Sequence, residues 1–566
     1  MFVRTKEFPG SQKKCIQIVK SIRQGNTVNQ KIVKHIGCSE DEKELEELRL
    51  LGEFVKDKLL HSNTLPLFST EELYDKTKLA RIQNFQQAFD QKKGKKTISY
   101  TQEDYMVNMS NLEEEVRFIN GIHDIYGELF DELNFKSIFK NPARQKAIVD
   151  TFKNVVLARI ANPDSKKSSV HNLEENFGIT LSLDYVYKMM DKLDDEAIEK
   201  LNNLAYKTTL SLFGKIDVVF FDATTIYFES FTEDEFKKNG YSKDLKFNQP
   251  QVLLALMVTD KGLPIGYEAY SGNTYEGHTL LDAISKLKAK YNIRSCIYVA
   301  DSGMFNQDNL KALEERGFDY IVGARIKNLP NNIQQEILNT QDYIDIDNIK
   351  AKEINFLGKR LIVTYSQKRA DKDKKDRLKQ IEKLEKKLAK HKNPKEFISN
   401  SICKKYLQIE QDKLTISIRQ DKIQEDEKWD GLKGIIVKSD TLSIQEALSH
   451  YRGLYQVEES FRITKHDLKV RPVYHYKPQR VKAHLAICFA AYILVRQLEY
   501  RVALQYKKLS FEYIRRLLID IQTSIVVEKT KRIRYAIPSK ISKEAKKIYQ
   551  IMGVTHQTTP YIVEKF

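Results

Sequence analysis

Short apolar runs alternate with amphipathic stretches through the middle of the chain, and this spacing predicts alternating strands and helices. The apolar runs are bounded by polar or turn residues, as is typical of strands, and they comprise residues 216–221, 252–258, 263–270, 295–300 and 318–322. Apolar residues follow helical spacing in residues 278–291 and 306–316. Asp260-Lys261-Gly262 marks a hairpin turn between the second and third runs. The order β-β-β-α-β-α-β predicts a mixed sheet covered by helices over residues 214–326.

The N-terminal portion divides into two predicted parts. Residues 1–100 alternate short apolar runs with basic residues, turn acidic and then become polar, which predicts a small β-rich segment, a charged helix and a linker. Residues 101–213 have helical spacing throughout, with one apolar face formed by Leu112, Val116, Ile119 and Ile122.

Within that helical region, Asn162-Pro163-Asp164 breaks one helix. Two short helices then flank Gly178, and the basic residues Lys166 and Lys167 stand at the start of the first. This pair is compatible with a helix-turn-helix that reads DNA and equally with an ordinary helical bundle.

The pattern changes after the mixed sheet. Residues 327–440 combine alternating strands with a charged stretch at 369–392, which predicts a β-rich insertion domain carrying a solvated helical arm. Residues 441–503 return to helices, one at 443–469 and an apolar one at 479–501. Residues 504–566 are basic and partly helical. The fold class is therefore multidomain α/β.

Charge and composition narrow the function. The chain has 566 residues, 41% of them hydrophobic, so several packed domains can form. Its 94 Lys and Arg against 77 Asp and Glu give a net charge of +17, which favours a polyanionic partner such as nucleic acid. A general basic bias without such a partner would give the same count.

Cysteine usage and hydropathy bear on compartment. The five cysteines are scattered singly, without a CxxC pair or a Cys/His cluster, so neither a disulfide framework nor a zinc site is expected. The N-terminus lacks the apolar core of a signal peptide, and the apolar run at 485–495 is too short to span a bilayer. We expect a cytoplasmic protein that does not enter the membrane, with that run as a buried core helix.

Two aspartates stand where predicted strands end. Asp222 follows the run at 216–221, and Asp301 follows the run at 295–300. Ligands of open α/β sheets bind beyond the carboxyl ends of strands, although a single aspartate there is more often a cap or turn former. Two such carboxylates repel each other, and Mg²⁺ or Mn²⁺ would relieve that repulsion.

A third carboxylate is expected from the helix at 443–469. Leu454, Val457, Phe461 and Leu468 form its apolar stripe, and Glu458 lies at the edge of that stripe, about 40° from Leu454 at 100° per residue. Tyr451 and Lys465, seven residues to either side, share the face of Glu458. The neighbouring Glu459 points away with Arg452 and is expected to be a surface charge. The alternative for Glu458 is an ordinary ion pair with Arg462 or Lys465.

These residues resemble the DDE transposases of bacterial insertion sequences, in the subgroup with an insertion domain before the glutamate. Its signature is Tyr-x2-Arg-x3-Glu-x6-Lys, which Tyr451, Glu458 and Lys465 match in register, whereas Leu454 occupies the arginine position. Phe221-Asp222-Ala223-Thr224-Thr225 and Ala300-Asp301-Ser302-Gly303-Met304 resemble its acidic motifs.

The resemblance implies an RNase H-like core in which Asp222, Asp301 and Glu458 are catalytic and bind Mg²⁺, with Mn²⁺ as a substitute. It implies binding of terminal inverted repeats, cleavage there, joining of 3′-hydroxyl ends to target DNA, and a dimer or higher assembly on double-stranded DNA. The expected DNA contacts are Tyr451, Arg452, Arg462, Lys465, Arg471, Lys166, Lys167 and Trp429.

Three alternatives remain at this stage. Trp429, the single tryptophan, could stack on a flipped base or could anchor the strand at 434–437, and packing is the commoner fate. The chain could be an RNase H-like nuclease that cleaves without joining ends. It could also be a DNA-binding transposase remnant without activity, although all three acidic residues are present.

Overall fold

A computed structural model of the chain describes residues 1–9, 13–24, 27–61, 107, 109–229, 232–240, 249–274, 279, 282–283, 285–286, 297–301, 307–346, 349–390, 405–410, 415–471 and 473–563. The chain divides into two compact units. Unit 1 comprises Met1–Ile216, Asp222–Tyr275 and Gln456–Phe566, and unit 2 comprises Asp217–Phe221 and Glu276–Tyr455. The predicted helix at 278–291 and the predicted linker after residue 61 lie mostly outside the described residues.

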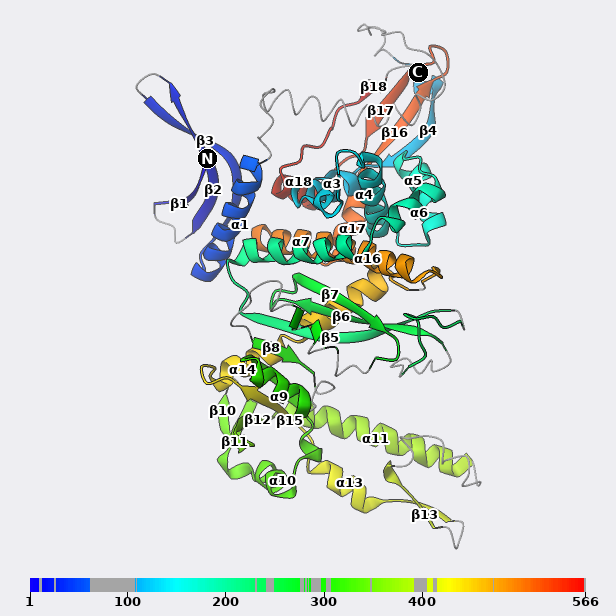
Figure 1. The fold of residues 1–566 in the computed structure, drawn as a ribbon. Helices are drawn as coiled ribbons and strands as arrows, with labels where there is room; N and C mark the ends of the chain where they lie inside the picture. Colours follow the sequence, from blue (N-terminus) through cyan, green and yellow to red (C-terminus); the bar gives the residue numbers. More distant parts are fainter. Residues whose placement is uncertain are drawn as a thin grey trace. The chain divides into compact units, whose positions relative to one another are not determined.

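Unit 1 begins with a three-stranded antiparallel sheet backed by a helix, as the sequence predicts (Figure 1). The elements are β1 (Phe2–Glu7), β2 (Lys14–Gln24), β3 (Thr27–Ser39) and α1 (Glu42–His61). Ile16, Ile18 and Leu48 are fully or almost fully buried between sheet and helix. The expectation of unpaired cysteines is wrong here, because Cys15 and Cys38 face each other across β2 and β3 and form a disulfide. Sequence spacing could not show this, because the pairing depends on strand register.

The helical region of unit 1 packs against itself and against a long C-terminal helix. Its helices are α3 (Gly121–Glu132), α4 (Lys146–Ala161), α5 (Lys166–Phe177), α6 (Leu183–Asp191) and α7 (Asp195–Phe213). The side chains of Ser165 and Ser182 cap α5 and α6, and Gly178 ends α5 with a φ of 65°.

The first predicted helix of this region is wrong. Residues Leu112–Ile119 form strand β4, which pairs antiparallel with β16 (Gln522–Glu528), about 400 residues further along the chain. Glu113 and Glu115 form ion pairs with Lys529, in the turn after β16, and with Arg534 of the next strand. A distant partner thus overrides the local helical spacing.

The C-terminal portion holds more strand than the sequence predicts. After α16 (Pro478–Gln505) and α17 (Phe511–Ile519), strands β16, β17 (Arg534–Pro538) and β18 (Tyr561–Val563) join β4 in a sheet of order β18-β17-β16-β4. Helix α18 (Lys543–Met552) lies between β17 and β18 in sequence. Helix α16 is long and apolar enough to cross a membrane, yet 89% of its most apolar window is buried inside the protein. This confirms the predicted core helix.

The sheet predicted for residues 214–326 begins in unit 1. Strands β6 (Gln251–Val258) and β7 (Pro264–Ser271) form the predicted antiparallel hairpin, and Gly262 at its turn has a φ of 72°. Helices α7 and α16 contact β7 and lie along the same side of the hairpin (Figure 1). Strand β5 (Val218–Tyr227) neighbours β6 and belongs to unit 1 from Asp222 onward.

Unit 2 contains a mixed sheet in the order β10-β11-β12-β15-β9-β8-β5. Its strands are β8 (Ile297–Ala300), β9 (Asp319–Ala324), β10 (Ile344–Ile346), β11 (Ile349–Phe356), β12 (Lys359–Tyr365) and β15 (Leu432–Lys438), with α9 (Gln307–Glu315) between β8 and β9 and α10 (Asn331–Leu338) before β10. Strands β5, β8 and β9 are parallel, whereas β15, β12, β11 and β10 are antiparallel to their neighbours. The strands predicted as an insertion domain therefore extend the sheet of β8 and β9.

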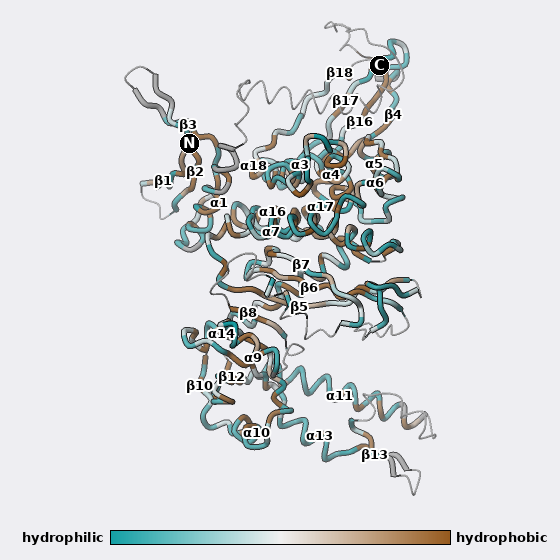
Figure 2. Tube along the Cα trace, in the orientation of Figure 1, coloured by the Kyte–Doolittle hydropathy of each residue, from teal (hydrophilic) through white to brown (hydrophobic). Residues whose placement is uncertain are grey.

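The charged arm is confirmed as a helix, α11 (Gln367–Lys390), and Figure 2 shows it as mainly hydrophilic. One face of α11 is nevertheless covered. Leu384 packs in an apolar cluster with Tyr406, Leu407 and Ile423 from the hairpin β13 (Leu407–Glu410), β14 (Thr415–Ile418) and helix α13 (Gln420–Glu427) and its flanks. Leu378, on the same helix, is 54% exposed.

Candidate active site

Asp222 lies within a strand rather than at its end. The sequence predicts that the strand stops before Asp222, but β5 continues through Ala223-Thr224-Thr225-Ile226 to Tyr227, so that prediction is wrong. These following residues are β-branched, aromatic or small and are mostly buried, which favours an extended chain. The Asp222 side chain is half-buried, and its Oδ1 accepts a hydrogen bond from the Ala223 amide at 2.8 Å.

Asp301 directly follows β8, as predicted, and its side chain is exposed. The Tyr451 hydroxyl donates a long hydrogen bond of 3.4 Å to Asp301 Oδ1, within unit 2. The parallel register of β5 and β8 pairs Phe220 with Val299. Asp222 and Asp301 each stand two positions beyond this pair in sequence.

The helix expected to carry Glu458 is broken into three parts. They are α14 (Ile444–Arg452), α15 (Tyr455–Arg462) and a π-helical turn, η9 (Ile463–Asp467). At the first break, a Cβ on Gly453 would lie 2.6 Å from the Phe220 ring of β5, so a glycine allows this close approach. Short π-helical turns inside helices occur frequently at functional sites.

The predicted apolar stripe of this helix is confirmed. Leu454, Val457, Phe461 and Leu468 are each at most 7% exposed. Glu458, at the edge of the stripe, is exposed. Arg462 does not take up the ion pair considered for Glu458, because its guanidinium pairs with Asp467 at 2.9 Å and approaches Glu459 at 3.8 Å.

Glu459, predicted to be a surface charge, is only partly exposed. Its side chain is 29% exposed, whereas Glu458 is in the exposed class. Burial raises the pKa of Glu499 on α16, Arg496 opposes that shift, and the negative charge of Glu459 adds to it. Glu459 therefore acts electrostatically on a buried ion pair of α16.

Two predicted DNA-contacting residues lie beside β5, the strand that carries Asp222. Lys465, in η9, donates a hydrogen bond to Oγ1 of Thr224, two residues after Asp222 on β5. The Arg471 guanidinium lies 4.8 Å from the centre of the Tyr227 ring at the end of β5. Both contacts are within unit 1.

The sequence did not predict two contacts of the candidate site, one made by Lys465 and one made by Tyr451. Thr224 is 7% exposed, and its hydroxyl receives the Lys465 contact. The Lys433 ammonium lies 4.6 Å from the centre of the Tyr451 ring, a cation–π contact in unit 2. Thr224 belongs to the acidic motif around Asp222 and could have been found from it, whereas Lys433 carries no sequence signal.

The remaining predicted DNA contacts divide by exposure. Arg452 and Lys167 are exposed. Lys166 is 4% exposed, and its Nζ lies 3.2 Å from Nδ1 of His484, so its placement in the core does not fit a contact with DNA. Trp429 is 7% exposed, which supports the packing alternative for this residue.

The donor set of Asp222, Asp301 and Glu458 fits a magnesium centre by its chemistry. Carboxylate oxygens are the ligands that Mg²⁺ and Mn²⁺ prefer, and the exposed Glu458 and Asp301 side chains leave oxygens accessible to a cation. Lys465 places a positive charge beside the Asp222 strand. That charge suits the anionic backbone of a nucleic acid.

Comparison with known families identifies the central part of the chain. Residues 213–494 match the family model described as the transposase DDE domain. This segment contains β5, β8, α15 and the first part of α16, and with them Asp222, Asp301 and Glu458. The chain is thus a member of the DDE transposases.

Solved transposase structures are distant matches. The piggyBac transposase synaptic complex with hairpin DNA is 10% identical, covers 71% of this chain and 77% of its own, and has a TM-score of 0.37. The Mos1 transposase paired-end complex with left transposon end is 13% identical, with 50% and 77% coverage and a TM-score of 0.14. The Mos1 mariner paired end complex with Mn is 13% identical, covers 50% of this chain and 78% of its own, and has a TM-score of 0.13. No curated protein matches the sequence.

Proposed function

We propose that this protein is the transposase of an insertion sequence, which cleaves the ends of its element and joins the 3′-hydroxyl ends to target DNA. The observation that carries the proposal is the transposase domain match over residues 213–494, which includes all three carboxylates identified from the sequence. The parallel pairing of Phe220 with Val299, two positions before each aspartate, supports a common role for Asp222 and Asp301. An RNase H-like arrangement of the mixed sheet follows from this assignment.

Asp222, Asp301 and Glu458 would hold two Mg²⁺ ions, with Mn²⁺ as a substitute. Bound metals of this kind supply activation of a water or 3′-hydroxyl and stabilisation of the leaving oxygen during in-line displacement. Tyr451 orients the Asp301 carboxylate through its hydroxyl, and Ala223 does the same for Asp222 through its amide. These contacts restrict the carboxylates before a metal binds.

Lys465 and Arg471 are the best-supported phosphate contacts. Both are tethered to β5, one through Thr224 and the other through Tyr227, so their positive charges stand along the strand that carries Asp222. The contact with double-stranded DNA would extend to the exposed Arg452 and Lys167. It would also include Arg462, which forms an ion pair with Asp467. We further propose that the protein acts in the cytoplasm as a dimer or higher assembly on paired inverted repeats.

The test is a transposition assay in which a donor plasmid carries a resistance marker between the DNA segments that flank the gene. We expect Mg²⁺-dependent cleavage at the element ends and insertion of the marker into a target plasmid. Asp222→Ala, Asp301→Ala and Glu458→Ala should each lower cleavage by about a hundredfold or more, because each carboxylate supports a metal that contributes several kcal/mol. Binding of the same DNA in a gel-shift assay should persist.

Glu459→Ala is the matched control, since this neighbouring carboxylate faces α16. It should retain cleavage. Activity in Glu458→Ala together with its loss in Glu459→Ala would refute the assignment of the third carboxylate. Cleavage without insertion would identify a nuclease that does not join ends, and binding without cleavage in the unaltered protein would identify an inactive remnant.

A further inference from the structure

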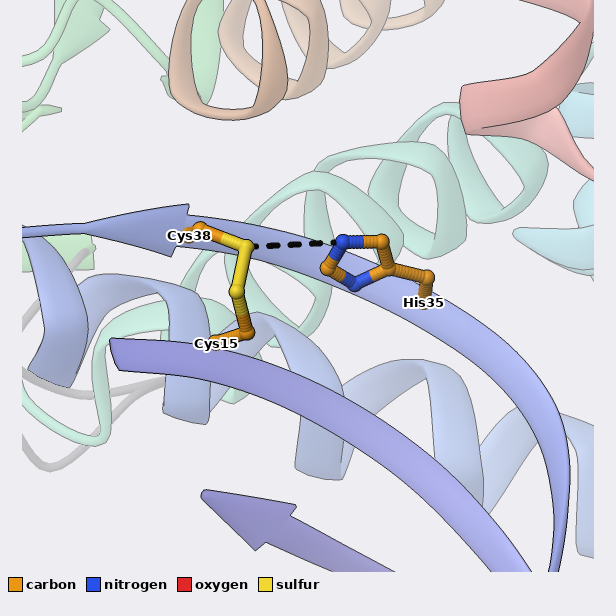
Figure 3. Close-up of side chains that lie close together, drawn as sticks. All are labelled: Cys15, His35 and Cys38. Carbon is orange, nitrogen blue, oxygen red and sulfur yellow. Dashed lines mark hydrogen bonds between the residues drawn. A yellow bond between two sulfur atoms is a disulfide. The ribbon is translucent and has the colours of Figure 1, made fainter. Parts of the chain in front are cut away.

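The N-terminal sheet of unit 1 gathers two cysteines and a histidine away from the carboxylates. Cys15 on β2 pairs in register with Cys38 on β3, and His35 lies three residues before Cys38 (Figure 3). One ligand atom from each of the three side chains lies within 4.8 Å of the others. Cys15 is buried, Cys38 is half-buried and His35 is exposed, so the cluster opens from the sheet toward solvent.

An irregularity in β3 puts His35 on the same face as the cysteines. Residues three apart in a regular strand point to opposite faces. Here the register pairs Ile16 with Gly37 and Gln17 with His35, so Ile36 is an extra residue and the alternation is reset between His35 and Cys38. Bulges of this kind re-aim side chains, and they are common beside functional sites.

Gly37 is needed where this bulge meets helix α1. A Cβ at this position would lie 2.8 Å from Cδ2 of Leu48, closer than side-chain carbons pack. Leu48 is fully buried in the core between α1 and the sheet, so it has little room to move. The glycine therefore lets β3 lie close to α1 while the bulge turns His35 toward Cys38.

The imidazole of His35 is held in one orientation by a backbone group. Its Nδ1 lies 3.3 Å from the carbonyl oxygen of Ile16. A carbonyl oxygen only accepts hydrogen bonds, so Nδ1 must carry the hydrogen. In the neutral ring the lone pair is then on Nε2, which lies 3.5 Å from Cys38 Sγ.

The disulfide form does not use that lone pair. A disulfide sulfur has no hydrogen to donate to Nε2, whereas a cation bound by the two thiolates would accept the lone pair as a third ligand. A backbone carbonyl that fixes the other ring nitrogen is the usual support of a metal-binding histidine. The arrangement thus has two soft sulfur donors and one pre-oriented nitrogen donor.

We propose that reduced Cys15 and Cys38, together with His35 Nε2, form a binding site for a thiophilic divalent cation of the Zn²⁺ type. Two sulfurs and one imidazole nitrogen are a common donor set for tetrahedral zinc, and the fourth position is left for water or another donor. The disulfide and the metal-bound form exclude each other, because both use the same two sulfur atoms. The site therefore loses its metal on oxidation.

The exchange is balanced when a small disulfide such as oxidised glutathione is the oxidant. The glutathione S–S bond breaks and takes up two electrons, the Cys15–Cys38 bond forms from the two thiolates, and the cation leaves. The two glutathione thiolates released then take protons from water.

The first test measures metal in the full-length protein, purified under a phosphine reductant and dialysed against Zn²⁺. We expect one Zn²⁺ per chain, and Co²⁺ in its place should give the thiolate-to-metal charge-transfer absorption of a tetrahedral sulfur site. Cys15→Ser and Cys38→Ser should each abolish that absorption. His35→Gln should weaken Co²⁺ binding by about tenfold or more while leaving thiolate absorption at high Co²⁺.

Cys488→Ala is the control, because Cys488 is a buried free cysteine on α16, outside the cluster. It should bind Co²⁺ as the unaltered protein does. Thermal unfolding of each variant without metal shows whether it is folded, and His35→Gln changes an exposed side chain, so it separates ligand loss from misfolding. Equal Co²⁺ absorption in the cysteine variants, or less than a tenth of a Zn²⁺ per reduced chain, would overturn the proposal.

The second test adds oxidised glutathione to the Zn²⁺-loaded protein and follows released Zn²⁺ with a chromogenic chelator. We expect Zn²⁺ release to match the loss of two thiols per chain, and a reductant should restore binding. Disulfide formation with the Zn²⁺ still bound would contradict the shared use of the two sulfurs.

Discussion

At the scale of single residues, Lys166 is an ammonium group taken out of water. Burial lowers its pKa to about 7, and the positive charge of Arg159 adds to the effect. Burial also lowers the pKa of His484, which lies 3.2 Å from the Lys166 Nζ. Both groups are thus held toward their neutral forms in the folded protein.

This burial makes the stability of unit 1 depend on pH. Between about pH 7 and 10 the unfolded chain keeps the Lys166 proton and the folded chain loses it, so the free energy of unfolding should rise with pH. One such group contributes up to about 1.4 kcal/mol per pH unit. Lys166→Met should remove that slope and stabilise the protein most near neutral pH, as measured by urea denaturation at several pH values.

Lys167→Met provides the comparison, because Lys167 is adjacent but exposed. Its stability profile should run parallel to that of the unaltered protein. A Lys166→Met profile with an unchanged slope would show that Lys166 stays protonated in the fold.

The candidate site shows what single residues reveal in a sequence. Asp301 was placed correctly because a short apolar run ends just before it, and Glu458 because helical spacing puts it beside the buried stripe. Lys166 was misjudged because a lysine next to a serine cap has the same local pattern whether it faces solvent or core. Burial is decided by α16, more than 300 residues away.

At the scale of elements, helices α3 and α16 are joined by a buried ion pair. The Arg501 guanidinium, 2% exposed, donates hydrogen bonds of 2.8 Å to both carboxylate oxygens of Glu132. Removing the carboxylate would leave a buried cation without its counter-charge. Glu132→Gln should therefore lower the free energy of unfolding by about 3 kcal/mol, measured by urea denaturation.

A second bidentate pair offers a matched comparison at the surface. Arg480 donates to both oxygens of Asp191 at 2.7 and 2.8 Å, but these side chains are 24% and 49% exposed. Asp191→Asn should cost less than about 1 kcal/mol, because water replaces the lost partner. Similar losses in the two variants would show that burial does not set the strength of the Glu132 pair.

Elements were predicted where their partners are close in sequence. The hairpin of β6 and β7 was found because its turn and both apolar runs lie within 20 residues. Strand β4 was missed because its hydrogen bonds go to β16. The helix around Glu458 was predicted as continuous because its helical spacing runs across Gly453, where the structure separates α14 from α15. The disulfide was missed for the same reason, since it needs the register of β2 and β3.

At the scale of the whole molecule, the sequence predicts net charge better than it predicts which strands pair in a sheet. The net charge of +17 is independent of how the chain folds, and it agrees with the DNA-binding class to which the domain belongs. The sheet of unit 2 could not be delimited from sequence, because β15 joins β9 only after more than 100 intervening residues. The strands of the predicted insertion at residues 327–440 continue the sheet of β9, and the sequence did not show this pairing.

The net charge leads to a prediction for DNA binding. Lys and Arg side chains that contact phosphates release condensed cations, and so the affinity falls as salt rises. For a duplex of the flanking DNA, we expect the association constant to fall by about a thousandfold or more between about 50 and 200 mM NaCl, as for a protein with at least six phosphate contacts. Fluorescence anisotropy with a labelled oligonucleotide measures this dependence, with EDTA present to prevent cleavage.

Single substitutions show which residues contribute to the salt dependence of the association constant. Lys465→Met and Arg471→Met should each reduce the logarithmic slope by about one, because each removes one released cation. Trp429→Phe should leave the slope unchanged, since Trp429 is buried and uncharged. An unchanged slope in both Lys465→Met and Arg471→Met would contradict this prediction and would place the DNA backbone elsewhere on the protein. Contact of these two residues with β5 would then have no role in DNA binding.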